Sequence, residues 1–185
     1  MSIIKKQLII ILDESADSKS NSVGPSLCFW AAYVYTPSED KHPTNLKISE
    51  ESRFESAILM KSINPKPARS GAIYNDNDTV IKICLDGMLR ALEACVYTIN
   101  KYNINEVIIC GDCKPAIDLV TGKKKRVAPS IVSICNQIDE FKDKYNSKGA
   151  QIDFRKVSKN QFTLYRDIDA IAKQVRGFMK KITEN

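Results

Sequence analysis

Residues 106–122 read Glu106-Val-Ile-Ile-Cys-Gly-Asp112-Cys-Lys-Pro-Ala-Ile-Asp-Leu-Val-Thr-Gly122. The run of apolar, β-branched residues at the start predicts a buried strand over 106–111. Asp112 follows that strand directly, and a helix is expected around 114–121. The unit therefore places a carboxylate at the end of a buried strand, where loops that carry functional groups converge.

Three other acidic residues belong with Asp112. Asp13 closes the apolar run of a strand predicted over 3–12, and Asp169 lies at the expected start of a last helix over 164–182. Glu55 lies in an acidic stretch between Asp13 and Asp112. Three or four carboxylates that meet at one site do not all stay ionised without a cation, so the pattern favours a metal site.

The rest of the chain alternates between strand and helix signals. Further strands are predicted over 27–36 and 151–157, with a possible short strand over 70–75. Helices are predicted over 49–63, where Ser52 and Glu55 have capping-box spacing, and over 78–102 and 129–145. Early strands followed by strand–helix alternation predict an α/β fold with a sheet of mixed direction.

The length and composition indicate an ordinary globular protein. The 185 residues suit a single domain over 1–185, with an insertion around 37–70. The net charge of +6 leaves room for a polyanionic partner. The N-terminal apolar run ends too soon for a signal peptide or a membrane span, so we expect an intracellular protein, cytoplasmic or nuclear (or in the nucleoid), with no membrane partner.

Six cysteines fall mostly inside apolar runs, where a free thiol behaves as a small hydrophobic side chain. Cys110 and Cys113 have C-x-x-C spacing, but a zinc site needs two more ligands and the sequence contains no second pair. Two half-buried thiols that flank Asp112 are favoured over a redox pair.

Several of these stretches resemble the ribonuclease H-like superfamily. The 106–122 unit is similar to the strand–Asp–helix unit of ribonuclease HI, including the Thr-Gly that ends the helix, and Asp169-Ala-Ile-Ala resembles the last motif of that family. The opening Asp13-Glu-Ser-Ala-Asp17 also resembles a bacterial branch whose members begin with Asp-Glu-Ser-Gly-Asp. The resemblance covers most of the chain apart from 37–70. It implies a mixed sheet, an antiparallel meander followed by parallel strands, flanked by helices.

The chemistry implied by the resemblance is phosphodiester hydrolysis with Mg²⁺ or Mn²⁺, with two ions expected. Hard cations of this kind prefer carboxylate oxygens. In the family, the first-strand Asp bridges the ions, a role that falls here to Asp13. Asp112 and Asp169 would each complete one ion.

The fourth carboxylate departs from the family pattern. Ribonuclease HI has a Glu near the start of the helix before the central strand, and an ungapped match puts Ile83 or Cys84 there. Asp86 and Glu93 fall on what should be the solvated face of that helix. Glu55 is the better candidate, so the fourth ligand is Glu55, Asp86 or absent. The loop before the last helix also lacks the family's His, since His42 is the only one in the chain.

The sequence thus predicts a metal-dependent nuclease whose default substrate is the RNA strand of an RNA–DNA hybrid. The alternatives are a catalytically weak or inactive binding or scaffold domain of the same fold, and a nuclease for DNA or structured RNA. The basic run Lys123-Lys124-Lys125-Arg126 is either a solvated loop or a contact for nucleic-acid phosphates, and Lys159 would extend that contact surface.

Overall fold

The computed structural model describes residues 6–15, 27–35, 56–62, 76–158, 169–170 and 173–174. These residues form a five-stranded sheet with the order β3-β2-β1-β4-β5. The strands are β1 (Gln7–Ser15), β2 (Leu27–Tyr35), β3 (Ser56–Ser62), β4 (Glu106–Gly111) and β5 (Gln151–Lys156). β1 pairs antiparallel with β2, and β2 with β3, whereas β1 pairs parallel with β4, and β4 with β5. The predicted α/β class and mixed strand direction are confirmed.

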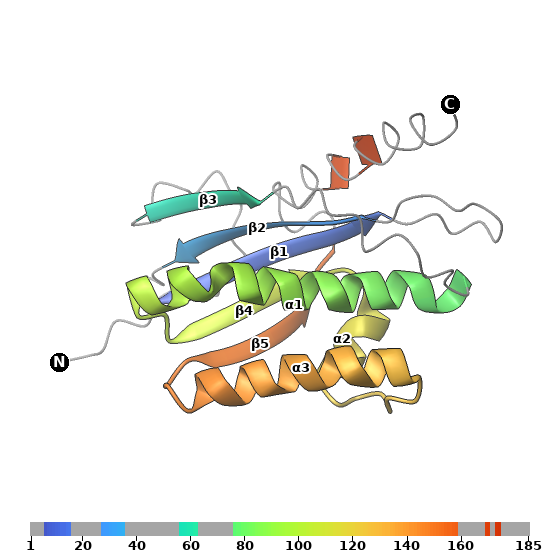
Figure 1. Ribbon diagram of the computed structural model, residues 1–185. Coiled ribbons are helices and arrows are strands. Elements are labelled where there is room, and N and C mark those ends of the chain that lie inside the picture. The colour runs from blue at the N-terminus through green and yellow to red at the C-terminus, as the bar shows by residue number, and fades with distance from the viewer. Residues whose placement is uncertain are drawn as a thin grey trace.

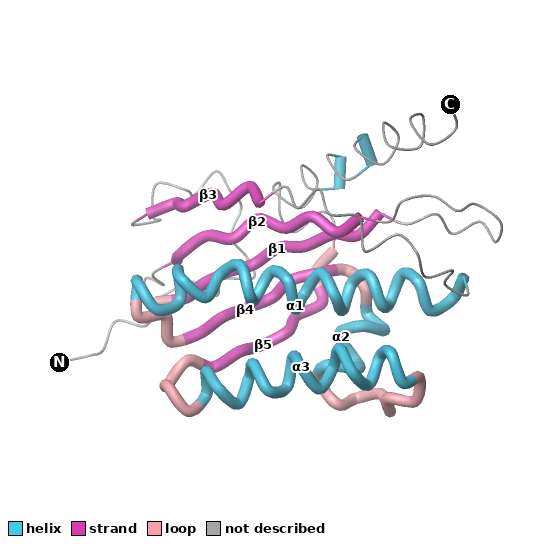
Figure 2. The backbone as a smooth tube through the Cα atoms, viewed as in Figure 1, coloured by secondary structure: helices cyan, strands magenta, loops and turns pink. Residues whose placement is uncertain are grey.

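Three helices lie against one face of this sheet. α1 (Asp76–Tyr102) crosses the middle of the sheet and α3 (Pro129–Asn146) lies alongside it, as Figure 1 and the backbone tube of Figure 2 show. The short helix α2 (Lys114–Val120) follows β4. Within the part of the chain that the structure describes, no helix is long and apolar enough to cross a membrane.

The main core lies between the sheet and these helices. Alternate residues of β1 (Leu8, Ile10 and Leu12) pack there with buried side chains of α1, α2 and α3. The other residues of the strand, such as Ile9 and Ile11, are also buried. A strand that is buried on both faces reads as a continuous apolar run, which is why the sequence predicts it directly.

β1 extends further than the sequence suggests. Its apolar run ends at Leu12, but the strand continues to Ser15 because β2 pairs with it residue by residue up to that point. Asp13 and Glu14 are therefore part of the ladder, opposite Phe29 and Cys28. The predicted end at residue 12 is wrong by three residues, since backbone pairing with a neighbour, rather than hydrophobicity, ends this strand.

The helix predicted over 49–63 is wrong where the structure describes that segment. Residues 56–62 form β3, which pairs antiparallel with β2 at the edge of the sheet. A short apolar run such as Ala57-Ile58-Leu59-Met60 is compatible with either helix or strand, and the unpaired edge of β2 decides the outcome. β3 also lies inside the segment 37–70 that the sequence treats as an insertion.

The other predicted elements agree closely with the structure. α1, α2 and α3, together with β2, β4 and β5, begin and end within about two residues of their expected bounds. The possible strand over 70–75 lies outside the described residues. Of the last predicted helix, residues 169–170 and 173–174 are described, and they are helical.

Candidate metal centre at the ends of β1 and β4

Two carboxylates meet where the parallel strands β1 and β4 end. The ladder pairs Ile11 with Cys110, and a Cβ built on Gly111 would lie 3.4 Å from a methyl group of Leu12. One residue further along each strand come Asp13 and Asp112. Because both strands run in the same direction, the side chains of these two residues leave the same end of the sheet, and Asp13 is almost completely buried there.

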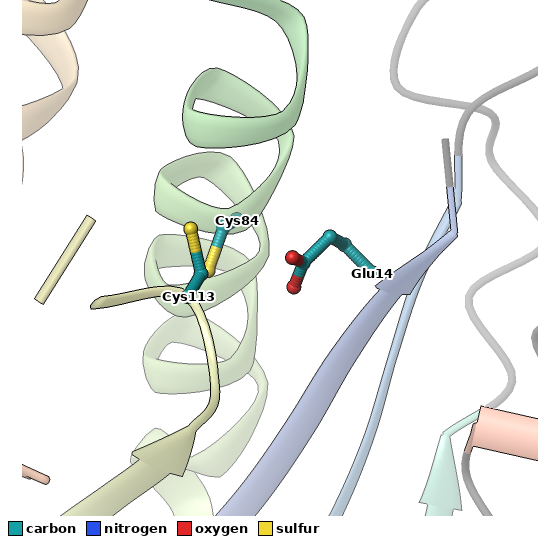
Figure 3. A group of neighbouring side chains, drawn as sticks. All are labelled: Glu14, Cys84 and Cys113. Carbon is teal, nitrogen blue, oxygen red and sulfur yellow. The ribbon is translucent and has the colours of Figure 1, made fainter. Parts of the chain in front are cut away.

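Glu14 completes a group of three carboxylates. Its neighbours Leu8, Ile10 and Leu12 alternate toward α1, so Glu14 also points to the α1 side of the sheet. Figure 3 shows its carboxylate extending from the end of β1 toward that helix. One carboxylate oxygen each from Asp13, Glu14 and Asp112 lie within 4.8 Å of one another.

The environment of Glu14 opposes a negative charge. Burial raises the pKa of its carboxyl to about 8, and the neighbouring Cys113, Asp112 and Asp13 add to the increase. Its Oε2 atom is buried and accepts no hydrogen bond from the described residues. A buried carboxylate oxygen without a donor, next to two other carboxylates, is an arrangement that a cation would stabilise.

These donors fit a hard divalent cation. Mg²⁺ and Mn²⁺ prefer oxygen ligands, and a group of three carboxylates offers oxygen atoms close enough together to share one ion or two. The residues present therefore match the metal class that the sequence predicts.

A pair of thiols lies on the other side of Glu14. Cys113 follows Asp112 and precedes α2, and Cys84 comes from the third turn of α1. An oxygen of Glu14 and the two sulfur atoms also lie within 4.8 Å of one another. Figure 3 shows the Glu14 carboxylate facing the two thiols. A hydrogen bond joins the two thiols and raises the pKa of Cys84 while it lowers that of Cys113.

The C-x-x-C spacing does not pair Cys110 with Cys113. Cys110 is buried on the sheet face opposite Val107 and Ile109, which belong to the core beneath the helices. The expectation that both thiols are half-buried is wrong. Cys110 is 1% exposed and Cys113 is 8% exposed, so both are buried. The partner of Cys113 is Cys84, 29 positions earlier in the chain.

A third thiol borders this group. Cys28 is opposite Glu14 in the β1–β2 ladder and therefore faces the same side of the sheet. Its sulfur contacts α1 where Gly87 has no side chain, because a Cβ at Gly87 would overlap it. Gly87 thus allows β2 and α1 to approach closely beside the site.

Among the described residues, the other acidic residues considered from the sequence lie in different surroundings. Asp169 is described and is not a member of either group; its Oδ2 accepts a hydrogen bond of 2.7 Å from Lys173. Glu55 lies outside the described residues. Arg90 forms ion pairs with Asp86 at 3.7 Å and with Glu93 at 3.0 Å, which agrees with the solvated helix face expected for these acids.

The basic run forms the connection between α2 and α3. Lys123, Lys124 and Lys125 are exposed. Arg126 is half-buried, where its guanidinium forms an ion pair with Asp139 of α3 and donates to the carbonyl oxygen of Leu119. Arg126 therefore anchors the loop, whereas the three lysines face solvent. Lys159 lies outside the described residues.

Sequence reasoning identifies Asp13 and Asp112 but not Glu14, Cys84 or Cys113 as a set. Consecutive residues on a strand point to opposite faces, so Asp13 and Glu14 are not expected to share a site. In the structure, one carboxylate oxygen of each nevertheless lies within 4.8 Å of the other. The one available signal is the family match that puts Ile83 or Cys84 at the position of the missing helix Glu.

Comparison with known proteins identifies the fold. The sequence matches no protein-family model and no curated protein. The structure is similar to that of ribonuclease H1 from the halophilic archaeon Halobacterium salinarum NRC-1, with a TM-score of 0.52, 14% identity and coverage of 91% of this chain and 96% of the other. It is also similar to LC11-RNase H1 in complex with an RNA/DNA hybrid, with a TM-score of 0.50, 14% identity and coverage of 95% and 99%. The chain has a ribonuclease H-like fold.

Proposed function

We propose that the protein is a divalent-metal-dependent nuclease that hydrolyses the RNA strand of RNA–DNA hybrids. The observation that carries the proposal is the group of carboxylates from Asp13, Glu14 and Asp112 at the ends of two parallel strands. In α/β sheets, ligands bind at the carboxyl ends of the strands, and the fold is that of known ribonucleases H.

Each of the three carboxylates has a distinct place in this proposal. Asp13 and Asp112 come from neighbouring strands and hold the centre of the site. Glu14 reaches toward α1, where the family has a Glu and this chain has Ile83 or Cys84 at the matching position, and we assign Glu14 the role of the carboxylate that this helix lacks. A bound Mg²⁺ or Mn²⁺ would activate a water molecule and neutralise the charge that develops on the phosphate.

Asp169 and Glu55 stay in the proposal as the residues that complete the metal ligands. Asp169 lies in a helical segment, where its carboxylate pairs with Lys173. An approaching cation would compete with the Lys173 ammonium for that carboxylate. The same enzymatic assay tests both residues.

The proposed substrate is a polyanion, and the exposed lysines of the α2–α3 connection suit it. Lys123, Lys124 and Lys125 are exposed, so we assign them to phosphate contacts together with Arg126 and Lys159. The preference for a hybrid rests on the ribonuclease H-like fold and on the hybrid bound in one structural neighbour. We further propose a single domain over 1–185 that acts inside the cell.

The test is cleavage of end-labelled RNA–DNA hybrid, duplex DNA and duplex RNA by the full chain, with Mg²⁺, with Mn²⁺ and with EDTA. We expect metal-dependent cleavage of the RNA strand of the hybrid. Asp112→Asn and Glu14→Gln should lower the rate by at least about 100-fold, since each replaces a charged ligand with an uncharged side chain of the same shape.

Glu93→Gln is the matched control, because Glu93 is an exposed carboxylate of α1 outside the group. It should cleave like the wild type. Hybrid binding without cleavage under any metal condition would contradict the nuclease and favour the binding domain. Metal-dependent cleavage of duplex DNA or duplex RNA alone would retain the nuclease and reject the hybrid.

A further inference from the structure

We infer that Glu14, Cys84 and Cys113 form a second metal site, which takes a thiophilic divalent cation such as Zn²⁺. The three donor atoms lie within 4.8 Å of one another and come from β1, α1 and the connection that follows β4. The inference does not depend on the nuclease proposal. Only one of its consequences does, and that consequence follows from the shared Glu14.

The chemistry of the donors separates this site from the carboxylate group. Thiolates are soft ligands that select Zn²⁺ over Mg²⁺, whereas the carboxylates of Asp13 and Asp112 select hard cations. Two sulfur atoms, one carboxylate oxygen and a water molecule make a four-coordinate zinc site of the open type. The sequence gives no hint of it, because no two of the three ligands show a zinc-binding spacing.

The packing holds the three donors in place. Cys84 is completely buried on α1, and Cys113 is 8% exposed at the start of α2. Glu14 aims its carboxylate at the two sulfur atoms, as Figure 3 shows, and the buried Oε2 atom accepts no hydrogen bond from the described residues. A cation at this point would give that oxygen a partner. Binding releases the protons of the two thiols and of the Glu14 carboxyl to solvent, and no electron is transferred.

Glu14 belongs to both groups of donors, so the two sites are coupled. A Zn²⁺ ion that holds Glu14 against the thiols leaves only Asp13 and Asp112 as ligands at the carboxylate site. If the nuclease proposal holds, Zn²⁺ at the thiol site therefore lowers the affinity for Mn²⁺ at the carboxylate site and inhibits cleavage. This consequence rests on the proposed function, whereas the thiol site itself does not.

The test is titration of the full, reduced chain with Cd²⁺, followed through the ultraviolet absorption of cadmium–thiolate bonds. We expect one Cd²⁺ per chain, displaced by Zn²⁺. Loss of even an outer-shell partner weakens metal binding about 10- to 100-fold, so Cys84→Ala and Cys113→Ala should each weaken it by at least about tenfold. Cys95→Ala is the matched control, since Cys95 is a completely buried thiol of the same helix outside the group.

X-ray absorption of the wild-type protein with one equivalent of Zn²⁺ supplies a reading that needs no variant. Two sulfur ligands at about 2.3 Å, with oxygen in the remaining positions, are expected. Zinc without sulfur ligands, or Cd²⁺ absorption that survives both Cys84→Ala and Cys113→Ala, would overturn the site. Neither measurement uses nuclease activity, so an inactive protein that binds zinc through two thiolates would reject the nuclease and keep this site.

Discussion

Glu14 is the residue on which both proposed sites depend. It is the only acid that approaches Asp13 and Asp112 on one side and the thiols of Cys84 and Cys113 on the other within the described residues. Its pKa of about 8 means that the carboxyl is largely protonated at neutral pH until a cation is bound. The residue therefore links metal binding, proton release and stability.

This linkage predicts how stability depends on pH in the metal-free protein. Between the ordinary value of 4.5 and about 8, the unfolded chain has lost the Glu14 proton while the folded chain retains it. The stabilisation is complete at low pH and is lost as pH rises toward 8, with a slope of at most about 1.4 kcal/mol per pH unit. Urea unfolding in EDTA at several pH values measures the slope.

Glu14→Gln is the control for this prediction, because the amide cannot ionise. The free energy of unfolding of the wild type minus that of the variant should fall across this range of pH. If the free energies of unfolding of the wild type and the variant change with pH in parallel, Glu14 has the same pKa in the folded and unfolded states, which would contradict the prediction.

Sequence reasoning at the residue scale succeeds where a residue's role follows from its place in the chain. Asp13 and Asp112 follow apolar runs, and that position is enough to bring them together once β1 and β4 pair in parallel. Cys84 and Cys113 meet because α1 packs against α2, the helix that Cys113 precedes. No spacing in the sequence encodes that contact.

At the scale of elements, α1 approaches β2 closely at one point. Gly87 faces the sulfur of Cys28, and a Cβ there would overlap it. Gly87→Ala gains about 0.5–1 kcal/mol in helix propensity, but the overpacking costs about 1–3 kcal/mol, so we expect net destabilisation. Urea unfolding at one fixed pH measures the difference.

A double-mutant cycle identifies the cause of that destabilisation. In a Cys28→Ala background the sulfur is gone and only the Cβ of residue 28 remains, 2.9 Å from the added methyl group. The cost of Gly87→Ala should therefore be smaller in that background. An equal cost in both backgrounds would place the strain elsewhere.

The elements also show which patterns predict structure from sequence alone. Long amphipathic helices such as α1 and the doubly buried β1 carry strong periodic signals, and their positions are predicted well. β3 is a seven-residue strand, and its apolar run is too short to distinguish strand from helix. Its identity comes from pairing with β2, which is a tertiary contact.

At the scale of the whole molecule, the chain has a net charge of +6, and four consecutive basic residues lie in the α2–α3 connection. Lys123, Lys124 and Lys125 are exposed, whereas Arg126 is held by Asp139. Replacing the three lysines with alanine should weaken hybrid binding and reduce the salt slope by up to about 0.9 per lost phosphate contact. Fluorescence anisotropy at several salt concentrations measures both quantities.

The same variant should keep its stability within about 0.5 kcal/mol, because exposed side chains contribute little to folding. Arg126→Ala is the contrasting variant, since it removes the ion pair with Asp139 and should lower stability. An unchanged salt slope in the triple-lysine variant would show that this loop is only a solvated surface.

The central claim is that Asp13, Glu14 and Asp112 hold a divalent cation. The direct measurement is titration of Mn²⁺ into the wild type, Glu14→Gln, Asp112→Asn and Glu93→Gln, with free Mn²⁺ followed by electron paramagnetic resonance. The claim predicts saturable binding that weakens by at least about tenfold in the Glu14 and Asp112 variants and is unchanged in Glu93→Gln. Wild-type protein that leaves the Mn²⁺ signal unaltered, or a Glu14→Gln variant that binds as tightly as the wild type, would contradict it.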